Sequence, residues 1–245
     1  MKSIHTAVSI AAVCALLTLP SRGAYDFFGG FIPRGTPTID GKLSEGEWDE
    51  TGRTTLYKFF GEDSLVVFYL QWDDENLYLG AEIEDYELWV DNYDADTPWE
   101  STWDDDALKM EIDPDRSRDE NLQATDRVFA VNADGTASRW DKGDGAGGTA
   151  AAETFDELDV AVQYTGKLND WTFKTLSEKK DRDTGFTVEA AMSWDNIMGS
   201  KNAAIPQDGD ALGINVTNIE DDTGGTLDPE YYESWKRVPD QITRF

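Results

Sequence analysis

The sequence predicts an all-β protein, an antiparallel β-sandwich of the jelly-roll or immunoglobulin-like kind with one or two short helical turns. Apolar and polar residues alternate with a period of two in many short segments. Turn-forming residues separate these segments every dozen or so positions, and helical periodicity is almost absent. Strands that are apolar on one face bury that face against a second sheet, so this pattern favours a sandwich.

The first two clear strands are predicted to form a β-hairpin. Residues 66–72 and 77–83 each place apolar side chains at every second position, and the polar residues 73–76 lie between them. A third strand is predicted over 108–112, where Leu108 and Met110 alternate with charged residues. It ends at the Asp-Pro-Asp turn signal of residues 113–115.

Further strands follow the same logic in the second half of the chain. Residues 128–132 lead into Ala133-Asp134-Gly135, which is typical of a hairpin turn. Ser193 is expected to cap one helical turn that ends at Met198. Residues 141–153 are rich in Gly and Ala, which predicts a flexible loop. The remaining predicted strands are 158–164, 171–176, 186–192 and 212–216.

Residues 1–23 are predicted to be a secretory signal peptide. Lys2 precedes an apolar run from Ala7 to Leu19 that is too short to span a bilayer, and small residues follow it. We therefore expect residues 24–245 to form a single domain that is secreted, periplasmic or at the cell surface. Removing the signal peptide also removes Cys14 and His5, the only residues of their types.

Composition excludes several classes of chemistry for residues 24–245. Without cysteine or histidine this part has no disulfides, thiolate nucleophiles, Ser-His-Asp triads or histidine-ligated zinc or haem. The whole chain has a formal net charge of −29, and loss of Lys2 and Arg22 with the signal peptide makes it more negative, so it repels nucleic acid and anionic lipid. We therefore expect neither a nucleic-acid partner nor membrane association after signal cleavage.

Five segments, taken in order, resemble the family 9 carbohydrate-binding modules and the wider DOMON-like superfamily. None is specific alone, and their order and spacing across the chain carry the resemblance. They are Pro37 to Gly41 followed by Glu47-Trp48, Leu77 to Leu79, Trp103 with Asp106 to Pro114, Phe186 to Trp194, and Gly213 to Val216.

The resemblance implies a β-sandwich that stacks a sugar between two tryptophans, often with structural calcium. Such modules are commonly attached to glycoside hydrolases, so a glycoside hydrolase acting alongside is an implied partner. By position in the family pattern, Trp103 and Trp235 match the stacking tryptophans, and Trp99 is a rival to Trp103. A pyranose has an apolar face and a rim of hydroxyls, which suits aromatic side chains with polar neighbours.

One position departs from the family pattern. Lys109 stands where members commonly have a carboxylate that hydrogen-bonds the sugar. Lysine donates to a hydroxyl but does not supply the same acceptor. Arg127 and Asn215 are further candidates for polar contacts with the ligand. Trp48, Trp72 and Trp194 lie in apolar patterns and are expected in the core.

Acidic residues in two segments are candidate calcium ligands. Asp113, Asp115, Ser117 and Asp119 alternate as oxygen ligands do in calcium loops, although Arg118 stands where an EF-hand needs glycine. A different type of calcium loop is therefore expected, with Asp104 as a further ligand. Asp91, Asp94 and Asp96, or residues 104–106, serve this purpose equally well.

The sequence thus favours an exported, non-catalytic module that binds an oligo- or polysaccharide on surface tryptophans. Three alternatives stay open. A structural or adhesive surface protein would use the aromatic residues for packing. A glycosidase needs only two carboxylates, but no spacing here marks a pair. A haem-binding domain would use Lys109 with Met192 or Met198, since Lys109 and Met110 are adjacent on a strand and face opposite sides. Neither haem nor zinc is expected.

Overall fold

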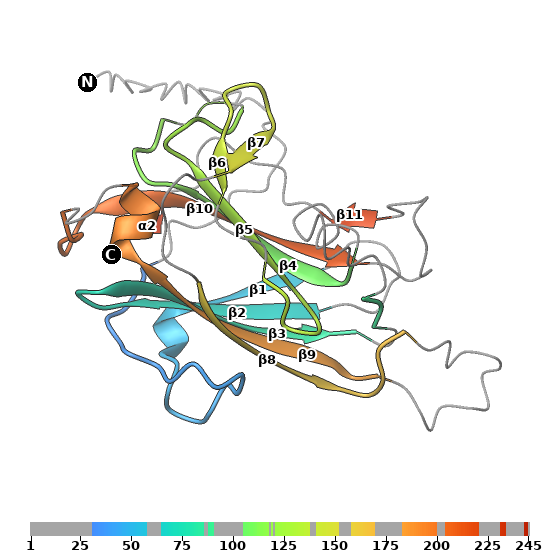
Figure 1. Ribbon diagram of the computed structural model, residues 1–245. Helices are drawn as coiled ribbons and strands as arrows, with labels where there is room; N and C mark the ends of the chain where they lie inside the picture. Colours follow the sequence, from blue (N-terminus) through green and yellow to red (C-terminus); the bar gives the residue numbers. More distant parts are fainter. Residues whose placement is uncertain are drawn as a thin grey trace, which may run out of the picture.

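The computed structural model is mostly β-structure (Figure 1). It describes residues 31–57, 65–85, 88–90, 105–117, 119, 121–137, 141–151, 158–169, 183–199, 204–220, 231–233 and 243–244. The strands are β1 (Arg53–Tyr57), β2 (Leu65–Trp72), β3 (Asn76–Glu84), β4 (Ala107–Asp113), β5 (Arg127–Asn132), β6 (Asp141–Gly143), β7 (Thr149–Ala151), β8 (Asp159–Thr165), β9 (Gly185–Ser193), β10 (Ala211–Glu220), β11 (Tyr231–Glu233) and β12 (Thr243–Arg244). The helical elements are the 3-10 turn η1 (Glu50–Gly52) and the short helix α2 (Trp194–Met198).

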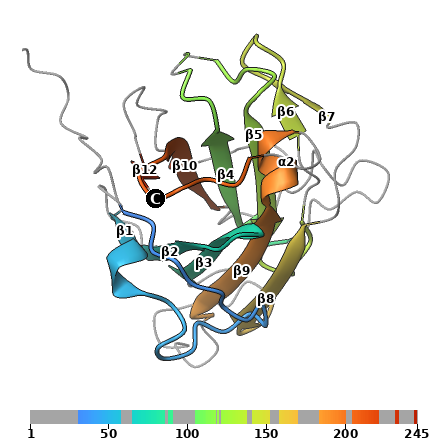
Figure 2. The ribbon, with the colours of Figure 1, turned by 90° about the vertical axis from the view of Figure 1, so that its left-hand side faces the viewer.

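The strands form two antiparallel sheets that pack face to face (Figures 1 and 2). The five-stranded sheet has the order β1-β2-β3-β9-β8. The seven-stranded sheet has the order β11-β10-β4-β5-β6-β7, and β12 also pairs with β10. The predicted antiparallel β-sandwich is therefore confirmed, and the predicted hairpin of residues 66–83 is the β2–β3 pair.

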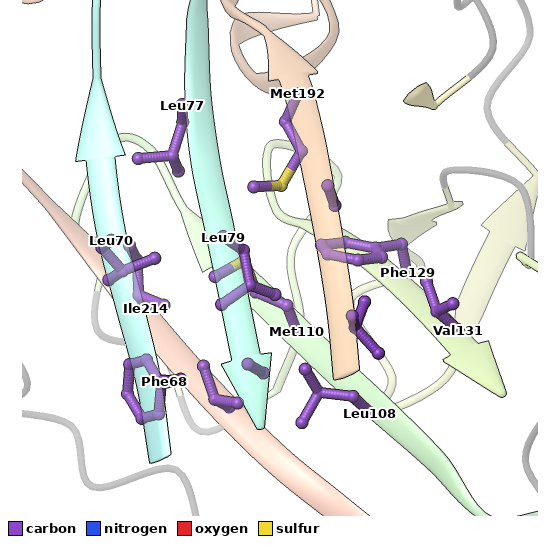
Figure 3. Packing of buried hydrophobic residues seen from close by; sticks show 14 of the residues in the cluster. Phe68, Leu70, Leu77, Leu79, Leu108, Met110, Phe129, Val131, Met192 and Ile214 are labelled. Atoms are coloured by element: carbon purple, nitrogen blue, oxygen red, sulfur yellow. The ribbon is translucent and has the colours of Figure 1, made fainter. Parts of the chain in front are cut away.

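The core lies between the two sheets, whose strands cross obliquely (Figure 3). Alternate residues of each strand enter it because successive side chains of a strand point to opposite faces. Phe68, Leu70 and Leu79 approach from the five-stranded sheet, and Met110 and Phe129 approach from the seven-stranded sheet (Figure 3). Trp72 and Trp194 belong to this core, as predicted. Trp48 is buried as well, but it packs on the outer face of the five-stranded sheet.

The predicted helical turn after residue 193 is confirmed as α2. The Ser193 hydroxyl accepts a hydrogen bond from the Asn196 main-chain N–H, and this satisfies one of the free donors at the helix start. The helix ends at Gly199, whose φ of +69° lies in the left-handed region. At one end of the sandwich, α2 follows directly on β9 (Figure 1).

The predicted flexible loop of residues 141–153 contains two short paired strands, so that prediction was wrong in part. β6 pairs with β5 and with β7, although its residues show no apolar alternation. The main chain of residue 122 packs against Gly143, where a Cβ atom would lie 2.2 Å from the Leu122 carbonyl carbon. Tertiary packing, rather than local pattern, thus imposes the strand.

Two other predictions fall on residues outside the described ranges, namely the strand at 171–176 and the signal peptide at 1–23. Both stay predictions. Within the described ranges, the helices are too short or too polar to cross a bilayer.

A buried carboxylate fastens the N-terminal segment to the five-stranded sheet. Glu189 on β9 is fully buried. Its Oε2 accepts hydrogen bonds from the main-chain N–H groups of Asp40 (2.9 Å), Gly41 (2.8 Å) and Lys42 (3.2 Å), and its Oε1 accepts one from the Trp48 indole (3.0 Å). Burial raises the pKa of Glu189, and these donors offset part of the shift.

The Trp48 ring packs closely on the same face. A Cβ atom at Gly80 on β3 would lie 2.7 Å from the indole ring, so the glycine leaves the space that the tryptophan fills. Together with the hydrogen bonds to Glu189, this packing holds residues 40–48 against part of the outer face of the five-stranded sheet.

We expect Glu189→Gln to lower the free energy of unfolding by about 2 to 4 kcal/mol, because the amide NH2 would face buried N–H donors. Urea unfolding followed by tryptophan fluorescence measures this change. Glu82→Gln is the matched control, since Glu82 is exposed on the same sheet, and it should change stability by less than about 0.5 kcal/mol. Equal effects of the two substitutions would contradict the fastening role of Glu189.

Candidate functional site

The strand pleat places a row of polar side chains on the outer face of the seven-stranded sheet. On β4, Leu108, Met110 and Ile112 belong to the core cluster, so Lys109 and Glu111 face outward. On β10, Thr217 lies opposite Lys109 and Asn215 lies opposite Glu111 in the antiparallel register. These four residues therefore form two adjacent cross-strand pairs on one face, and we refer to them as the polar row.

Hydrogen bonds tie three members of the polar row together. The Lys109 ammonium lies 3.1 Å from Glu111 Oε1, and the Asn215 side-chain amide donates to Glu111 Oε2 at 2.7 Å. The side chains of Lys109 and Glu111 are only 19% and 14% exposed. Partial burial strengthens their attraction compared with an ion pair in open water. These two contacts, one at each carboxylate oxygen, hold the Glu111 side chain in one orientation.

Two oxygens of the polar row have no hydrogen-bond partner among the described residues. They are Asn215 Oδ1 and Thr217 Oγ1, and their residues are 8% and 1% exposed. Buried polar atoms in folded proteins are normally satisfied by protein, water or ligand. A ligand with hydroxyl groups has donors of the right kind for both oxygens, but because both are closed to solvent it would reach them only after the atoms that cover them move aside.

Arg127 occupies a different environment from the polar row. It lies opposite Ile112 in the register and therefore faces the interior of the sandwich. Its guanidinium donates to the carbonyls of Asn196 (3.1 Å), Ala124 (3.0 Å) and Asp126 (2.8 Å). Desolvation lowers the pKa of Arg127, and the Asp126 carboxylate opposes this shift. Arg127 thus links the end of α2 to the turn before β5.

Gly199 makes room for this link. A Cβ atom at Gly199 would lie 2.1 Å from Arg127 Nη2, and the residue also needs a positive φ to end the helix. The contacts of Arg127 with three main-chain carbonyls give it a structural role, and the residue lies on the opposite side of the sheet from Lys109 and Asn215.

Three carboxylates gather where β4 ends and β5 begins. Oxygen atoms of Asp113, Asp115 and Asp126 all lie within 4.8 Å of one another. Gly213, opposite Asp113 in the register, leaves space for it, because a Cβ atom there would lie 3.1 Å from the Asp113 Cβ. We call these three aspartates the acidic group. It continues the outer face beyond Glu111.

The structure brings together some of the predicted site residues. Lys109 and Asn215 lie beside each other in the polar row, and Asp113 and Asp115 share the acidic group. Asp119 is exposed and is not a member of that group. Trp99, Trp103, Trp235 and Asp104 lie outside the described residues, and their roles stay predictions.

Sequence reasoning missed Glu111, Thr217 and Asp126. The first two could have been found, because each is a polar residue two positions from a candidate in a strand with period-two alternation. Asp126 joins Asp113 only through the pairing of β4 with β5, which no local pattern reveals.

The family model described as "Carbohydrate family 9 binding domain-like" matches residues 39–241. The chain therefore belongs to this family, and the predicted resemblance is confirmed.

Several known proteins are similar to this chain over part of its length. Endo-1,4-beta-xylanase A of Thermotoga neapolitana is 27% identical over 175 residues, which make up 70% of this chain but only 13% of that enzyme. A family 9 carbohydrate-binding module from Caldicellulosiruptor kristjanssonii, solved with cellotriose, is 19% identical, with a TM-score of 0.49 over 79% of this chain and 77% of that one. A structure from Bacteroides uniformis shares the fold at 11% identity, with a TM-score of 0.50 over 87% of this chain and 96% of that one.

We expect Arg127→Lys to lower the free energy of unfolding by about 2 to 3 kcal/mol, because an ammonium cannot reach all three carbonyls from one position. Saccharide affinity of the folded variant should equal that of the unsubstituted protein. Arg53→Lys is the control, since the Arg53 side chain is 40% exposed and lies 3.7 Å from Glu50. Lost affinity with unchanged stability would instead assign Arg127 to the ligand.

Proposed function

We propose that this chain is an exported, non-catalytic module that binds an oligo- or polysaccharide on the outer face of its seven-stranded sheet. The observation that carries the proposal is the match of residues 39–241 to a carbohydrate-binding family. The buried oxygens Asn215 Oδ1 and Thr217 Oγ1, without partners among the described residues, mark the part of the sheet that we propose is involved. They lie beside an ammonium and a carboxylate. Family membership supports the same class of ligand.

The chemistry of the polar row suits a sugar ring. Each sugar hydroxyl donates one hydrogen bond and accepts others. Lys109 is a donor, Glu111 is an acceptor, and Asn215 and Thr217 offer acceptors at their unpartnered oxygens. Neighbouring hydroxyls on one ring would therefore meet groups of matching type on two adjacent strands.

The tryptophans Trp103 and Trp235, with Trp99 as an alternative to Trp103, complete the proposed site. Flat aromatic rings cover the apolar C–H face of a pyranose while the polar row engages its hydroxyl rim. Their assignment rests on their positions in the family pattern. Affinity would be moderate, since stacking and a few hydrogen bonds must offset desolvation and lost freedom of motion.

A β-1,4-linked plant polysaccharide is the proposed ligand, with a glycoside hydrolase acting alongside the module. The matched enzyme is named an endo-1,4-beta-xylanase, and the chain corresponds to a small part of its length. This supports a role in polysaccharide binding rather than cleavage. A glycan-array screen with a parallel assay for released reducing sugar tests both statements. Retention without release is expected, and release would contradict a non-catalytic role.

Two substitutions test the site itself. We expect Trp235→Ala to weaken oligosaccharide binding at least about tenfold, because the stacking surface is lost. Thr217→Val keeps the shape of the side chain and removes Oγ1, so binding should weaken about threefold to tenfold. Isothermal titration calorimetry measures both effects, and circular dichroism confirms the fold.

Thr55→Val is the matched control for Thr217→Val, since Thr55 is a partly exposed residue on the other sheet, and it should leave affinity unchanged. Folded variants that bind as well as the unsubstituted protein would contradict the proposed site. If the folded protein binds no glycan on the array, the result would favour an adhesive or structural role.

We also propose that the acidic group holds a structural calcium ion. Carboxylate oxygens are hard donors, which calcium prefers, and three carboxylates converge within 4.8 Å. One is at the end of β4, one is in the turn that follows, and one directly precedes β5. Asp113, Asp115 and Asp126 would hold the ion, and its positive charge would offset their mutual repulsion. Because Asp113 belongs to β4 and Asp126 directly precedes β5, the ion would join the two strands at their ends.

Saturating calcium is expected to raise the unfolding temperature by about 5 °C relative to protein in chelator, since a ligand that binds only the folded state stabilises it. Asp113→Asn should weaken calcium binding about tenfold, because one charged donor is lost. Thermal unfolding and calcium titration calorimetry measure these effects. Asp159→Asn is the control, since Asp159 is exposed on β8. Identical unfolding temperatures with calcium and with chelator would contradict the proposal.

A further inference from the structure

The polar row holds an amine, a carboxamide and a carboxylate in mutual contact. The Lys109 ammonium lies 3.1 Å from Glu111 Oε1, and the Asn215 side-chain nitrogen lies 2.7 Å from Glu111 Oε2. One carboxylate therefore touches both an amine on β4 and a carboxamide on β10. An amine and a carboxamide that are held together in this way are the two reactants for an amide bond between side chains.

The sheet register puts the two reactants within reach of each other. Lys109 lies opposite Thr217, and Glu111 lies opposite Asn215, so Asn215 is the diagonal neighbour of Lys109 on the same outer face. Diagonal neighbours in an antiparallel pair are close enough for long side chains to touch. The ion pair with Glu111 also draws the flexible lysine side chain toward the Asn215 end of the row.

The three groups lie in a largely desolvated place. The side chains of Lys109 and Glu111 are 19% and 14% exposed, and Asn215 is 8% exposed. When Nζ passes a proton to Glu111 Oε1, two charged groups become two neutral groups, which lose less solvation energy in a buried site than an ion pair does. The neutral amine is the nucleophilic form of lysine, and Glu111 is the adjacent base that produces it.

We propose that Lys109 and Asn215 form an intramolecular isopeptide bond that joins β4 covalently to β10. The amine nitrogen Nζ attacks Asn215 Cγ, a new bond forms between Nζ and Cγ, and the bond between Cγ and Nδ2 breaks. Glu111 acts first as general base toward Nζ and then as general acid toward Nδ2. Both protons that Nζ loses pass to Nδ2, which departs as ammonium, and Glu111 ends as the carboxylate. The reaction uses no other reactant.

This cross-link goes beyond the proposed function and does not depend on it. Residues 24–245 contain no cysteine, so a disulfide cannot fasten this part of the chain. A bond between residues 109 and 215 would close a loop of about 100 residues and restrict the unfolded chain as a disulfide does. The new amide keeps an N–H donor and the Oδ1 acceptor, so both types of group stay in the polar row.

Intact mass spectrometry of the purified, folded protein tests the proposal. The measured mass should fall below the mass calculated from the sequence by one molecule of ammonia. Tryptic digestion should yield a linked pair of peptides that contain Lys109 and Asn215, without cleavage after Lys109. Lys109→Arg keeps the positive charge but cannot form the bond, so its mass should equal the calculated mass. In Glu111→Gln the linked fraction should fall at least about tenfold, because the base is lost.

Lys142→Arg is the matched control. Lys142 is a half-buried lysine on β6 of the same sheet, and it lies opposite Arg127 and Ala150 rather than beside a carboxamide on β10. This variant should lose one ammonia as completely as the unsubstituted protein does. The mass of the unsubstituted protein decides the question even if a variant fails to fold.

Three results would overturn the cross-link. They are a folded, unsubstituted protein with the full calculated mass, a loss of ammonia that persists in Lys109→Arg, and a loss that maps to peptides without Lys109 and Asn215. None of them would contradict the proposed function, which the saccharide-binding measurements test separately. Conversely, a linked protein that binds no saccharide would confirm the cross-link and contradict the proposed function.

Discussion

Burial of every second side chain between two sheets is the constraint on which the rest of this molecule depends. The interior requires Leu108, Met110 and Ile112 from β4, and the pleat then sends Lys109 and Glu111 outward. The same rule fixes Asn215 and Thr217 on β10, since their neighbours Ile214 and Val216 are buried. A slip of one residue in register would exchange the two sets. The position of the site thus follows from the packing of the core.

Two buried charged residues join loops to this framework in the same way. Glu189 accepts main-chain and indole N–H groups from residues 40–48, and Arg127 donates to main-chain carbonyls of residues 124, 126 and 196. Each charged group therefore satisfies backbone atoms that would otherwise need water. Neither lies in the polar row, so the chain separates the charges that join loops to the sheets from the charges of the proposed site.

The sequence was sufficient for the sandwich, the β2–β3 hairpin, the α2 turn and the burial of Trp72, because these depend on local alternation and capping. Strands β6 and β7 could not be predicted, since pairing with β5 and close packing at Gly143 impose them on small residues without alternation. Within the candidate site, Lys109 and Asn215 were predicted, but Asp126 joins Asp113 only through cross-strand pairing. The interior orientation of Arg127 likewise depends on register, which composition does not encode.

All six residues of β5 are buried, even though the strand lies in a two-layered protein. A strand that is covered on both faces rarely unfolds locally, and its amide hydrogens are expected to be among the last in the protein to exchange with solvent. β5 pairs directly with β4, which carries Lys109 and Glu111. The part of the polar row on β4 is therefore hydrogen-bonded to a rigid neighbouring strand. At the proposed saccharide site these strand residues therefore have fixed positions, so little of the binding energy would be spent on ordering them.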